Sequence, residues 1–119
     1  MKKVLIADDE TDILKVVSFR LKKAGYEVFE ASNGQIAIDL ISQNKPDLIL
    51  LDLRMPIMDG YEVCAKIKND ETLKNIPIIL LTASSSKIAE KKNELKAEDC
   101  MIKPFNPDEL LEKVRKLIG

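Results

Sequence analysis

Short apolar runs alternate with amphipathic segments along the whole chain. Five of the runs have the length, composition and flanking turn residues of strands: residues 4–7, 26–31, 48–51, 78–81 and 100–102. After each run, apolar side chains recur at the three- to four-residue spacing of a helix that buries one face. This alternation predicts an α/β fold, a single doubly wound (βα)5 domain built on a five-stranded parallel sheet.

Four of the five expected helices have a well-defined apolar face. The first ends at Gly25, and the last begins at the N-cap and N1 pair Asn106-Pro107. The inward positions are Ile13, Leu14, Val17 and Leu21 in the first helix, Ile36, Ala37, Leu40 and Ile41 in the second, Val63, Cys64 and Ile67 in the third, and Leu110, Leu111, Val114, Leu117 and Ile118 in the fifth.

The remaining helical segment, residues 84–95, is rich in lysine and glutamate. It has only Ile88, Ala89 and Leu95 to bury. A helix with so little apolar surface gains little free energy from packing, so we expect it to be weakly held and a candidate moving part.

The length and charge of the chain narrow the classes of function. Its 119 residues correspond to one ordinary domain, residues 1–119. Nineteen basic and twenty acidic residues give a formal net charge of −1, which supplies no global positive field for nucleic acid or an anionic membrane. No apolar stretch has the length of a signal peptide or a membrane span. We therefore expect a soluble cytoplasmic protein that binds neither DNA nor membranes directly.

The chain contains no histidine. This excludes a His general base, a Ser-His-Asp triad and a phosphohistidine carrier, and it leaves Cys64 and Cys100 without partners for a zinc site. We expect both cysteines to be reduced and buried. Any chemistry must use carboxylates, hydroxyls and amines.

Residues with complementary chemistry directly follow four of the expected strands. Asp8 and Asp9 follow the first, Asp52 the third, Thr82 the fourth and Lys103 the fifth. A parallel sheet gathers such positions at its carboxyl edge, where open α/β sheets place their ligand sites. If the first and third strands are neighbours, the three carboxylates converge and repel one another, and an all-oxygen cluster of this kind favours Mg²⁺. Each residue alone is more often a turn former or a solvated charge, so the prediction depends on the whole set.

Four blocks of the sequence resemble the response regulator receiver family of two-component signalling. They are Ile6-Ala7-Asp8-Asp9-Glu10, residues 51–60, Leu81-Thr82-Ala83 and Lys103-Pro104-Phe105. Their order and separations match over essentially the whole chain, which is far more specific than any one block. The resemblance implies a flavodoxin-like strand order, 2-1-3-4-5, and a cis peptide bond between Lys103 and Pro104.

The resemblance also implies a role for each residue around the acidic cluster. Asp52 would accept a phosphoryl group on its carboxylate. Asp9, Asp52 and the backbone carbonyl of Arg54 would bind Mg²⁺ directly, and Asp8 would act through water.

Three further residues would contact the phosphoryl group. Lys103 supplies a fixed positive charge, Thr82 a hydroxyl donor that moves toward the phosphoryl group, and Ala83 a backbone N–H. The domain would catalyse only its own phosphorylation and slow dephosphorylation, so it is not a turnover enzyme.

The resemblance extends to partners. The phosphoryl donor would be a histidine kinase or a histidine phosphotransfer protein, met by the first helix and the loop at Pro104-Phe105. Phe105 and Ile57 would supply apolar contacts there, with core packing as the equal alternative. The output would be a downstream protein target or effector domain, and a phosphorylation-dependent dimer stays open.

The chain departs from the family pattern near the fourth helix. Cys100 stands where receivers usually carry Tyr or Phe, Lys96 stands where glycine is frequent, and the stretch between Thr82 and Lys103 is about one residue shorter. A cysteine cannot fill the volume of an aromatic ring, so we expect a different output surface there and an unaffected acidic pocket.

Three other interpretations of this pattern compete with a phosphorylated receiver. A haloacid-dehalogenase-type phosphatase needs its nucleophile after the first strand and a second Asp two places later, which this sequence lacks. A flavodoxin-like FMN carrier needs a glycine- and hydroxyl-rich phosphate loop, and Asp8-Asp9-Glu10 would repel the phosphate. A receiver-like interaction module that is not phosphorylated remains the alternative, suggested only by Cys100.

Overall fold

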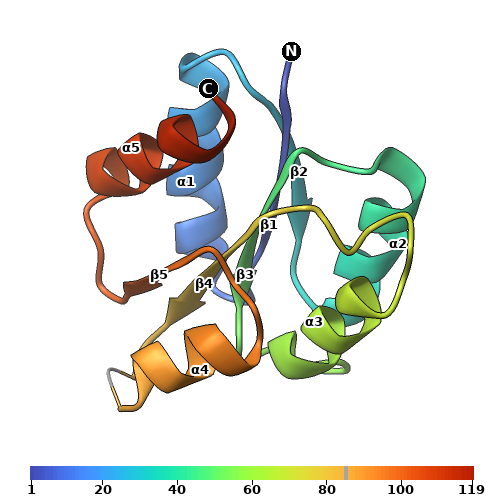
Figure 1. Cartoon of the computed structure of the whole chain (residues 1–119). Coiled ribbons are helices and arrows are strands. Elements are labelled where there is room, and N and C mark those ends of the chain that lie inside the picture. Colours follow the sequence, from blue (N-terminus) through green and yellow to red (C-terminus); the bar gives the residue numbers. More distant parts are fainter. Residues whose placement is uncertain (85) are drawn as a thin grey trace.

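Five parallel strands form one sheet in the order β2-β1-β3-β4-β5 (Figure 1). The computed structural model describes residues 1–84 and 86–119. The strands are β1 (Lys3–Ala7), β2 (Glu27–Ala31), β3 (Leu48–Asp52), β4 (Ile78–Thr82) and β5 (Asp99–Ile102). The predicted fold class and strand order are therefore confirmed, and so is the cis peptide bond between Lys103 and Pro104.

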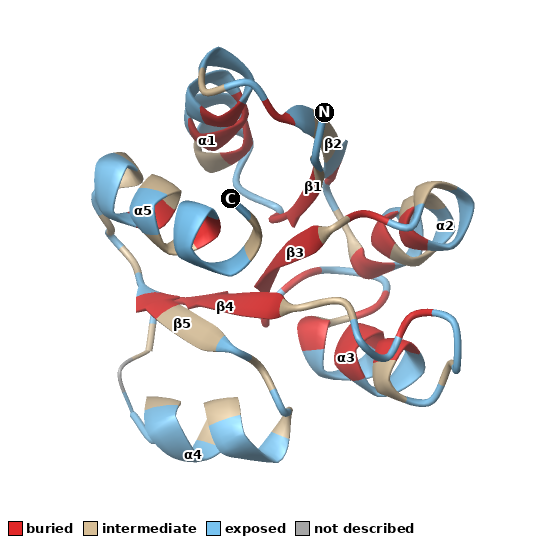
Figure 2. Cartoon of the chain, turned by 45° about the horizontal axis from the view of Figure 1, so that its top comes forward, coloured by how far each residue is buried: buried red, intermediate tan, exposed pale blue. Residues whose placement is uncertain are grey.

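Helices cover both faces of the sheet. They are α1 (Thr11–Lys23), α2 (Gly34–Asn44), α3 (Gly60–Lys68), α4 (Ile88–Glu94) and α5 (Pro107–Ile118). One core cluster joins α1 and α5 to one face, and a second joins α2 and α3 to the other (Figure 2). Every residue of β3 and β4 is buried, as expected of central strands in a parallel sheet.

Side-chain caps determine where three helices begin. The Asn33 side chain accepts a hydrogen bond from the backbone N–H of Ile36, at 2.9 Å, at the start of α2. Asp59 caps α3 through Glu62 in the same way, and Asn106 caps α5 through Asp108. Each cap satisfies a backbone donor that the helix leaves unpaired. The Asp59 cap also fixes the end of the loop that follows Asp52.

Some predicted inward positions are wrong. Ile36 and Leu117 are exposed, because Ala37 with Ile41, and Leu110 with Val114, mark the centre of each buried stripe. Ile36 lies at the edge of its stripe, and Leu117 lies in the last turn of α5.

The cysteine prediction holds only in part. Cys64 and Cys100 are free thiols, and burial raises the pKa of Cys64 to about 11. Cys100 is only half-buried, because β5 is an edge strand that α4 leaves partly uncovered.

The fourth helix is shorter than predicted. It begins at Ile88 rather than at residue 84, none of its residues is buried, and Ala89 is exposed. Part of the predicted segment, Ser85, lies outside the described residues. Leu95, just after α4, packs partly buried against the core. Across the described part of the chain, no helix has the length and apolar character needed to cross a membrane.

Replacement of Gly60 by alanine tests the packing of α3 against the loop. A Cβ atom at this position would lie 2.3 Å from the Asp52 carbonyl oxygen and 2.7 Å from the Leu53 Cα. Both neighbours are backbone atoms that cannot rotate away, so G60A should lower the free energy of unfolding by roughly 1–3 kcal/mol. Urea denaturation measures this, and exposed Lys66→Ala on the same helix serves as the control. Equal stability of the wild type and G60A would contradict the close approach.

Hydrogen exchange tests how firmly α4 is held. Because α4 buries no residue and α1 buries four, the amides of α4 should exchange roughly tenfold faster or more than those of α1. Peptide-level exchange followed by mass spectrometry measures both helices in one sample. Equal protection in the two helices would show that α4 is held by contacts stronger than its burial indicates.

Candidate functional site

The carboxyl edge of the sheet gathers a lysine and three carboxylates from distant parts of the chain. The Lys103 ammonium lies 2.8 Å from Asp8 Oδ2, 3.1 Å from Glu10 Oε1 and 3.3 Å from Asp52 Oδ2. Asp8 is fully buried and Asp52 is only 4% exposed. The parallel register places the ends of β1 and β3 side by side, which brings Asp8 and Asp52 together as the sequence predicted.

Backbone hydrogen bonds hold these side chains in place. The Glu10 N–H donates to Asp8 Oδ1 at 2.9 Å, and the Arg54 N–H donates to Asp52 Oδ1 at 3.2 Å. The Lys103 N–H donates to the Thr82 carbonyl at 2.7 Å and so continues the pairing of β5 with β4. Each functional group is therefore anchored through the turn that follows its strand.

The environment changes the proton affinities of the central pair. Burial raises the pKa of the Asp52 carboxyl to about 6; the Arg54 N–H and Lys103 lower it, and the charge of Asp8 raises it further. Burial lowers the pKa of Lys103, but its close contacts with Asp8 and Glu10 and the negative charge of Asp52 outweigh this and raise the pKa above its usual range. Lys103 is therefore a permanent positive charge beside a carboxylate that burial destabilises.

The sequence indicates no separate role for Glu10, and its contact with Lys103 appears only in the structure. Its carboxylate reaches Lys103 from the residue before α1, and it lies with those of Asp8 and Asp9 in a cluster whose ligand oxygens are all within 4.8 Å of one another. The signal was present in the sequence as a third acidic residue in the Asp8-Asp9-Glu10 run.

The acidic cluster fits a hard divalent cation. Among the residues that the structure describes, buried Asp8 Oδ2 has no hydrogen-bond partner, and its 2.8 Å contact with Lys103 is an ion pair. This buried carboxylate oxygen lies next to the exposed carboxylate of Asp9, and carboxylate oxygens are ligands that Mg²⁺ prefers. The structure does not place Asp52 in the same 4.8 Å cluster, although Asp52 and Asp8 share Lys103.

The other predicted site residues surround this centre. Thr82 is buried at the end of β4, where its hydroxyl accepts a hydrogen bond from the Ser84 N–H at 3.2 Å. Ala83 is exposed, so its small side chain leaves the approach to Lys103 open. Arg54 is exposed and shares a groove of about 490 Å³ with Asp9, Asp59 and Tyr61.

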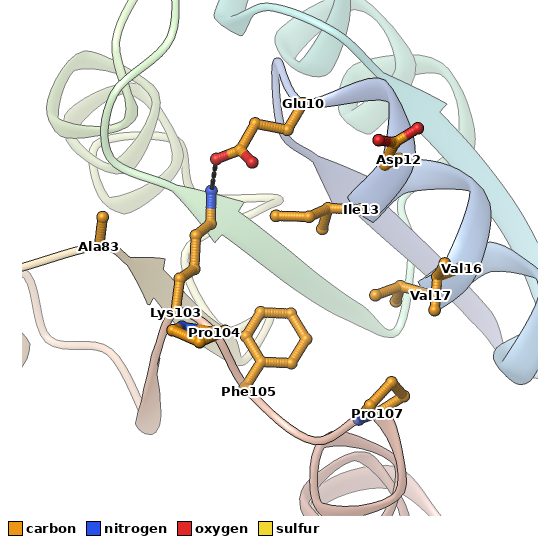
Figure 3. A pocket seen from close by; sticks show the side chains of 10 residues that line it. All are labelled: Glu10, Asp12, Ile13, Val16, Val17, Ala83, Lys103, Pro104, Phe105 and Pro107. Carbon is orange, nitrogen blue, oxygen red and sulfur yellow. Dashed lines mark hydrogen bonds and ion pairs between the residues drawn. The ribbon is translucent and has the colours of Figure 1, made fainter.

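A second groove, of about 510 Å³, opens between α1 and the loop after β5 (Figure 3). Its floor is apolar, and the Glu10–Lys103 contact closes the end nearest the acidic cluster. The residues that line it are Glu10, Asp12, Ile13, Val16, Val17, Ala83, Lys103, Pro104, Phe105 and Pro107. Ile57, in contrast, lies outside both grooves, 80% exposed, with a positive φ of 71°.

Comparisons with known proteins agree on one family. The sequence model described as "Response regulator receiver domain" matches residues 4–115. A probable transcriptional regulator, ycf27, from Guillardia theta is 43% identical over 119 residues. The match covers 98% of this chain and 45% of that protein, so the chain spans about half the length of this curated relative.

Solved structures of the family superpose closely on this chain. The chemotaxis response regulator CheY4 of Vibrio cholerae gives a TM-score of 0.91 at 34% identity, with 99% of each chain covered. The response regulator TrrA of Thermotoga maritima, in complex with Mg²⁺ and BeF, gives 0.87 at 38% identity, covering 99% of this chain and 100% of that one.

The raised pKa of Asp52 predicts how stability depends on pH in metal-free buffer. A folded-state pKa of about 6, above the ordinary value of 3.8, means that the ionised carboxylate destabilises the folded state, and that this penalty grows as pH rises from about 4 to 6. Asp52→Asn should therefore stabilise the protein by about 3 kcal/mol at pH 7.5 but only about 1 kcal/mol at pH 4.5.

Urea denaturation at the two pH values, with a chelator present, measures the difference. The exposed carboxylate of Asp39 offers a matched control, since Asp39→Asn should change the free energy of unfolding by less than about 0.5 kcal/mol at either pH. A gain from D52N that is the same at both pH values would show that burial does not raise the pKa of Asp52.

Proposed function

Because the chain belongs to the response regulator receiver domain family of two-component systems, we propose that it is a phosphorylation switch whose phosphoacceptor is Asp52. The observation that carries the proposal is the Lys103 ammonium, shared at 3.3 Å or less by Asp8 and Asp52 at the carboxyl edge of the sheet. Opposite charges held at a fixed distance in a nearly buried pocket are what phosphoryl transfer requires of a protein.

The residues around the acidic cluster would hold the metal ion. Asp9, Asp52 and the Arg54 carbonyl are the proposed direct ligands of Mg²⁺, and Asp8 would act through a water molecule. When bound, Mg²⁺ would supply positive charge to neutralise the phosphoryl oxygens. The hydrogen-bond-free Asp8 Oδ2 and the carboxylates of the Asp8-Asp9-Glu10 run support this ligand set. The TrrA structure, solved with Mg²⁺ and BeF, supports it from a relative.

Asp52 itself would act as the nucleophile. One carboxylate oxygen forms a bond to phosphorus while the bond between phosphorus and the donor's imidazole nitrogen breaks, and the leaving nitrogen keeps the electron pair. Lys103 would stabilise the negative charge on the transferring oxygens, since its ammonium already points at Asp52. Water later cleaves the acyl phosphate, which releases inorganic phosphate and regenerates the carboxylate. The domain would thus catalyse only its own modification and its slow reversal.

Thr82 and Ala83 would recognise the phosphoryl group once it is attached. The Thr82 hydroxyl is buried and holds the Ser84 N–H, so turning it toward a phosphoryl oxygen would release the segment that leads into α4. The Ala83 backbone N–H would be the second donor. Chemistry at Asp52 would in this way change the position of a helix that buries no residue.

The proposed partners follow from the family. A histidine kinase or histidine phosphotransfer protein would supply the phosphoryl group, and the apolar groove between α1 and the loop after β5 would take part in docking, with Phe105 as one contact. Ile57 is 80% exposed and so is free to make the second predicted contact. The output would pass to a protein target or an effector domain. A phosphorylation-dependent dimer is compatible with the exposed α4.

A receiver-like module that is not phosphorylated is the second candidate. Its support is Cys100, which leaves the usual aromatic position without a ring. The ion pair of Lys103 and Asp52 favours the phosphorylated receiver. A nearly buried charge pair is costly to desolvate, and a module that is not phosphorylated would not require one.

Labelling with a small phosphoryl donor tests the proposal. Incubation with acetyl phosphate and Mg²⁺ should add one phosphoryl group, located at Asp52 by mass spectrometry after borohydride reduction of the acyl phosphate. D52N should abolish the label, and a chelator should suppress it, whereas the surface control Asp39→Asn should be labelled like the wild type. Acid-stable labelling at another residue, or label in D52N, would count against Asp52 as the phosphoacceptor.

A further inference from the structure

The Lys103 ammonium has as many carboxylate neighbours as it has N–H donors. A lysine ammonium carries three donors, and three carboxylate oxygens, from Asp8, Glu10 and Asp52, lie within 3.3 Å of it. Glu10 and Asp52 accept hydrogen bonds from the ammonium, and Asp8 forms an ion pair with it, so three anionic oxygens already surround it. If a phosphoryl oxygen is to come equally close to Lys103, one of these contacts must weaken. The resting arrangement therefore raises the question of which carboxylate gives way.

The three carboxylates that contact Lys103 differ in how far they are buried. Asp8 is fully buried, and its Oδ2 has no hydrogen-bond partner, so moving Lys103 away would leave a buried charge uncompensated. Asp52 is nearly buried and is the reacting group itself. Glu10 is different because its side chain is 58% exposed, so water can replace the ammonium at little free-energy cost.

Among the described residues, the Glu10 side chain makes no hydrogen bond or ion pair other than its contact with Lys103. It occupies the N-cap position of α1 but makes no capping hydrogen bond, although capping is the usual role of a side chain there. Its carboxylate points instead across the mouth of the pocket toward Lys103, as Figure 3 shows. The contact links the start of α1 to the residue after β5.

We propose that Glu10 is a positioning residue for Lys103: its carboxylate is the resting partner that the ammonium exchanges for a phosphoryl oxygen. The inference rests on the proposed phosphorylation of Asp52. In the resting state Glu10 holds the ammonium at the mouth of the pocket, and during transfer Lys103 keeps Asp8 and gives up Glu10.

The direction of the effect follows from differential binding. Only interactions that are stronger in the transition state than in the ground state accelerate a reaction. The Glu10–Lys103 contact belongs to the ground state, so weakening it lowers the barrier. Glu10→Gln keeps the shape and a neutral acceptor but removes the charge, and charge-assisted hydrogen bonds are about twice as strong as neutral ones. Because exposed ion pairs are weak, we expect an increase of about two- to fivefold in rate rather than orders of magnitude.

The experiment compares wild type, Glu10→Gln and Glu27→Gln. Glu27 is a matched control: it is an exposed glutamate at the start of β2, and no ion pair joins it to Lys103 among the described residues. Initial rates of acyl phosphate formation are measured against Mg²⁺ concentration, which separates the rate at saturating Mg²⁺ from the half-saturating concentration. E10Q should raise the saturating rate about two- to fivefold, and E27Q should leave it within about 1.5-fold.

A second phosphoryl donor separates lysine release from simple charge repulsion. Removing a negative charge could speed the approach of the anionic acetyl phosphate without involving Lys103. Phosphoramidate carries less negative charge, so an effect of repulsion alone would shrink toward the wild-type rate with this donor. The proposal expects the same increase for E10Q with both donors.

Several outcomes would overturn the proposal. An E10Q saturating rate equal to or below that of the wild type would show that Glu10 is not a competing partner of Lys103. A higher half-saturating Mg²⁺ concentration with an unchanged saturating rate would make Glu10 a metal ligand instead. Both outcomes leave the proposed function intact, whereas a wild type that acetyl phosphate does not label at Asp52 would refute the proposed function itself. Thermal melting of E10Q within a few degrees of wild type excludes misfolding.

Discussion

The attraction between one lysine and several carboxylates governs the functional end of this protein. Asp8 and Asp52 are taken almost completely out of water at the ends of neighbouring strands, where two negative charges would repel each other strongly. The Lys103 ammonium offsets that repulsion from the end of β5, two strands away from β3 in the sheet. In the proposed function, the same ammonium would stabilise the incoming phosphoryl group.

The fold places this arrangement at the carboxyl edge of the sheet and supports it from the two fully buried strands, β3 and β4. β3 and β4 are buried along their whole length, so Asp52 and Thr82, their last residues, are held by well-packed strands. The close approach of Gly60 to the Asp52 carbonyl and the Asp59 cap of α3 fix the loop after Asp52 from its far end. A rigid scaffold with charged loops at one edge is how α/β proteins combine stability with function.

The region of α4 and β5 contrasts with these buried central strands. α4 buries none of its residues, begins after a left-handed Lys87 and is followed by a left-handed Lys96, where related receivers frequently have glycine. Cys100 lies half-buried on the adjacent edge strand in place of a large aromatic side chain. A signal that moves Thr82 would therefore reach a helix with few contacts to break, through a path that lacks the bulky side chain common in the family. The carboxylates of the acidic pocket follow β1 and β3, on the other side of β4 from these substitutions.

The sequence by itself determined the helices and strands and their order along the chain. Apolar runs and helical spacing located all five strands and five helices, because burial imposes a period on the chain that can be read without coordinates. The position of Asp8, Asp52, Thr82 and Lys103 at strand ends followed from the same pattern. Only the tertiary structure decided which contacts these residues make. That Lys103 is shared with Glu10, that Asp8 Oδ2 lacks a hydrogen bond, and that Ile36 faces solvent all depend on distances between segments remote in sequence. Periodicity reports which face of an element is buried, whereas the partner of a charged side chain depends on how the separate elements are packed in space.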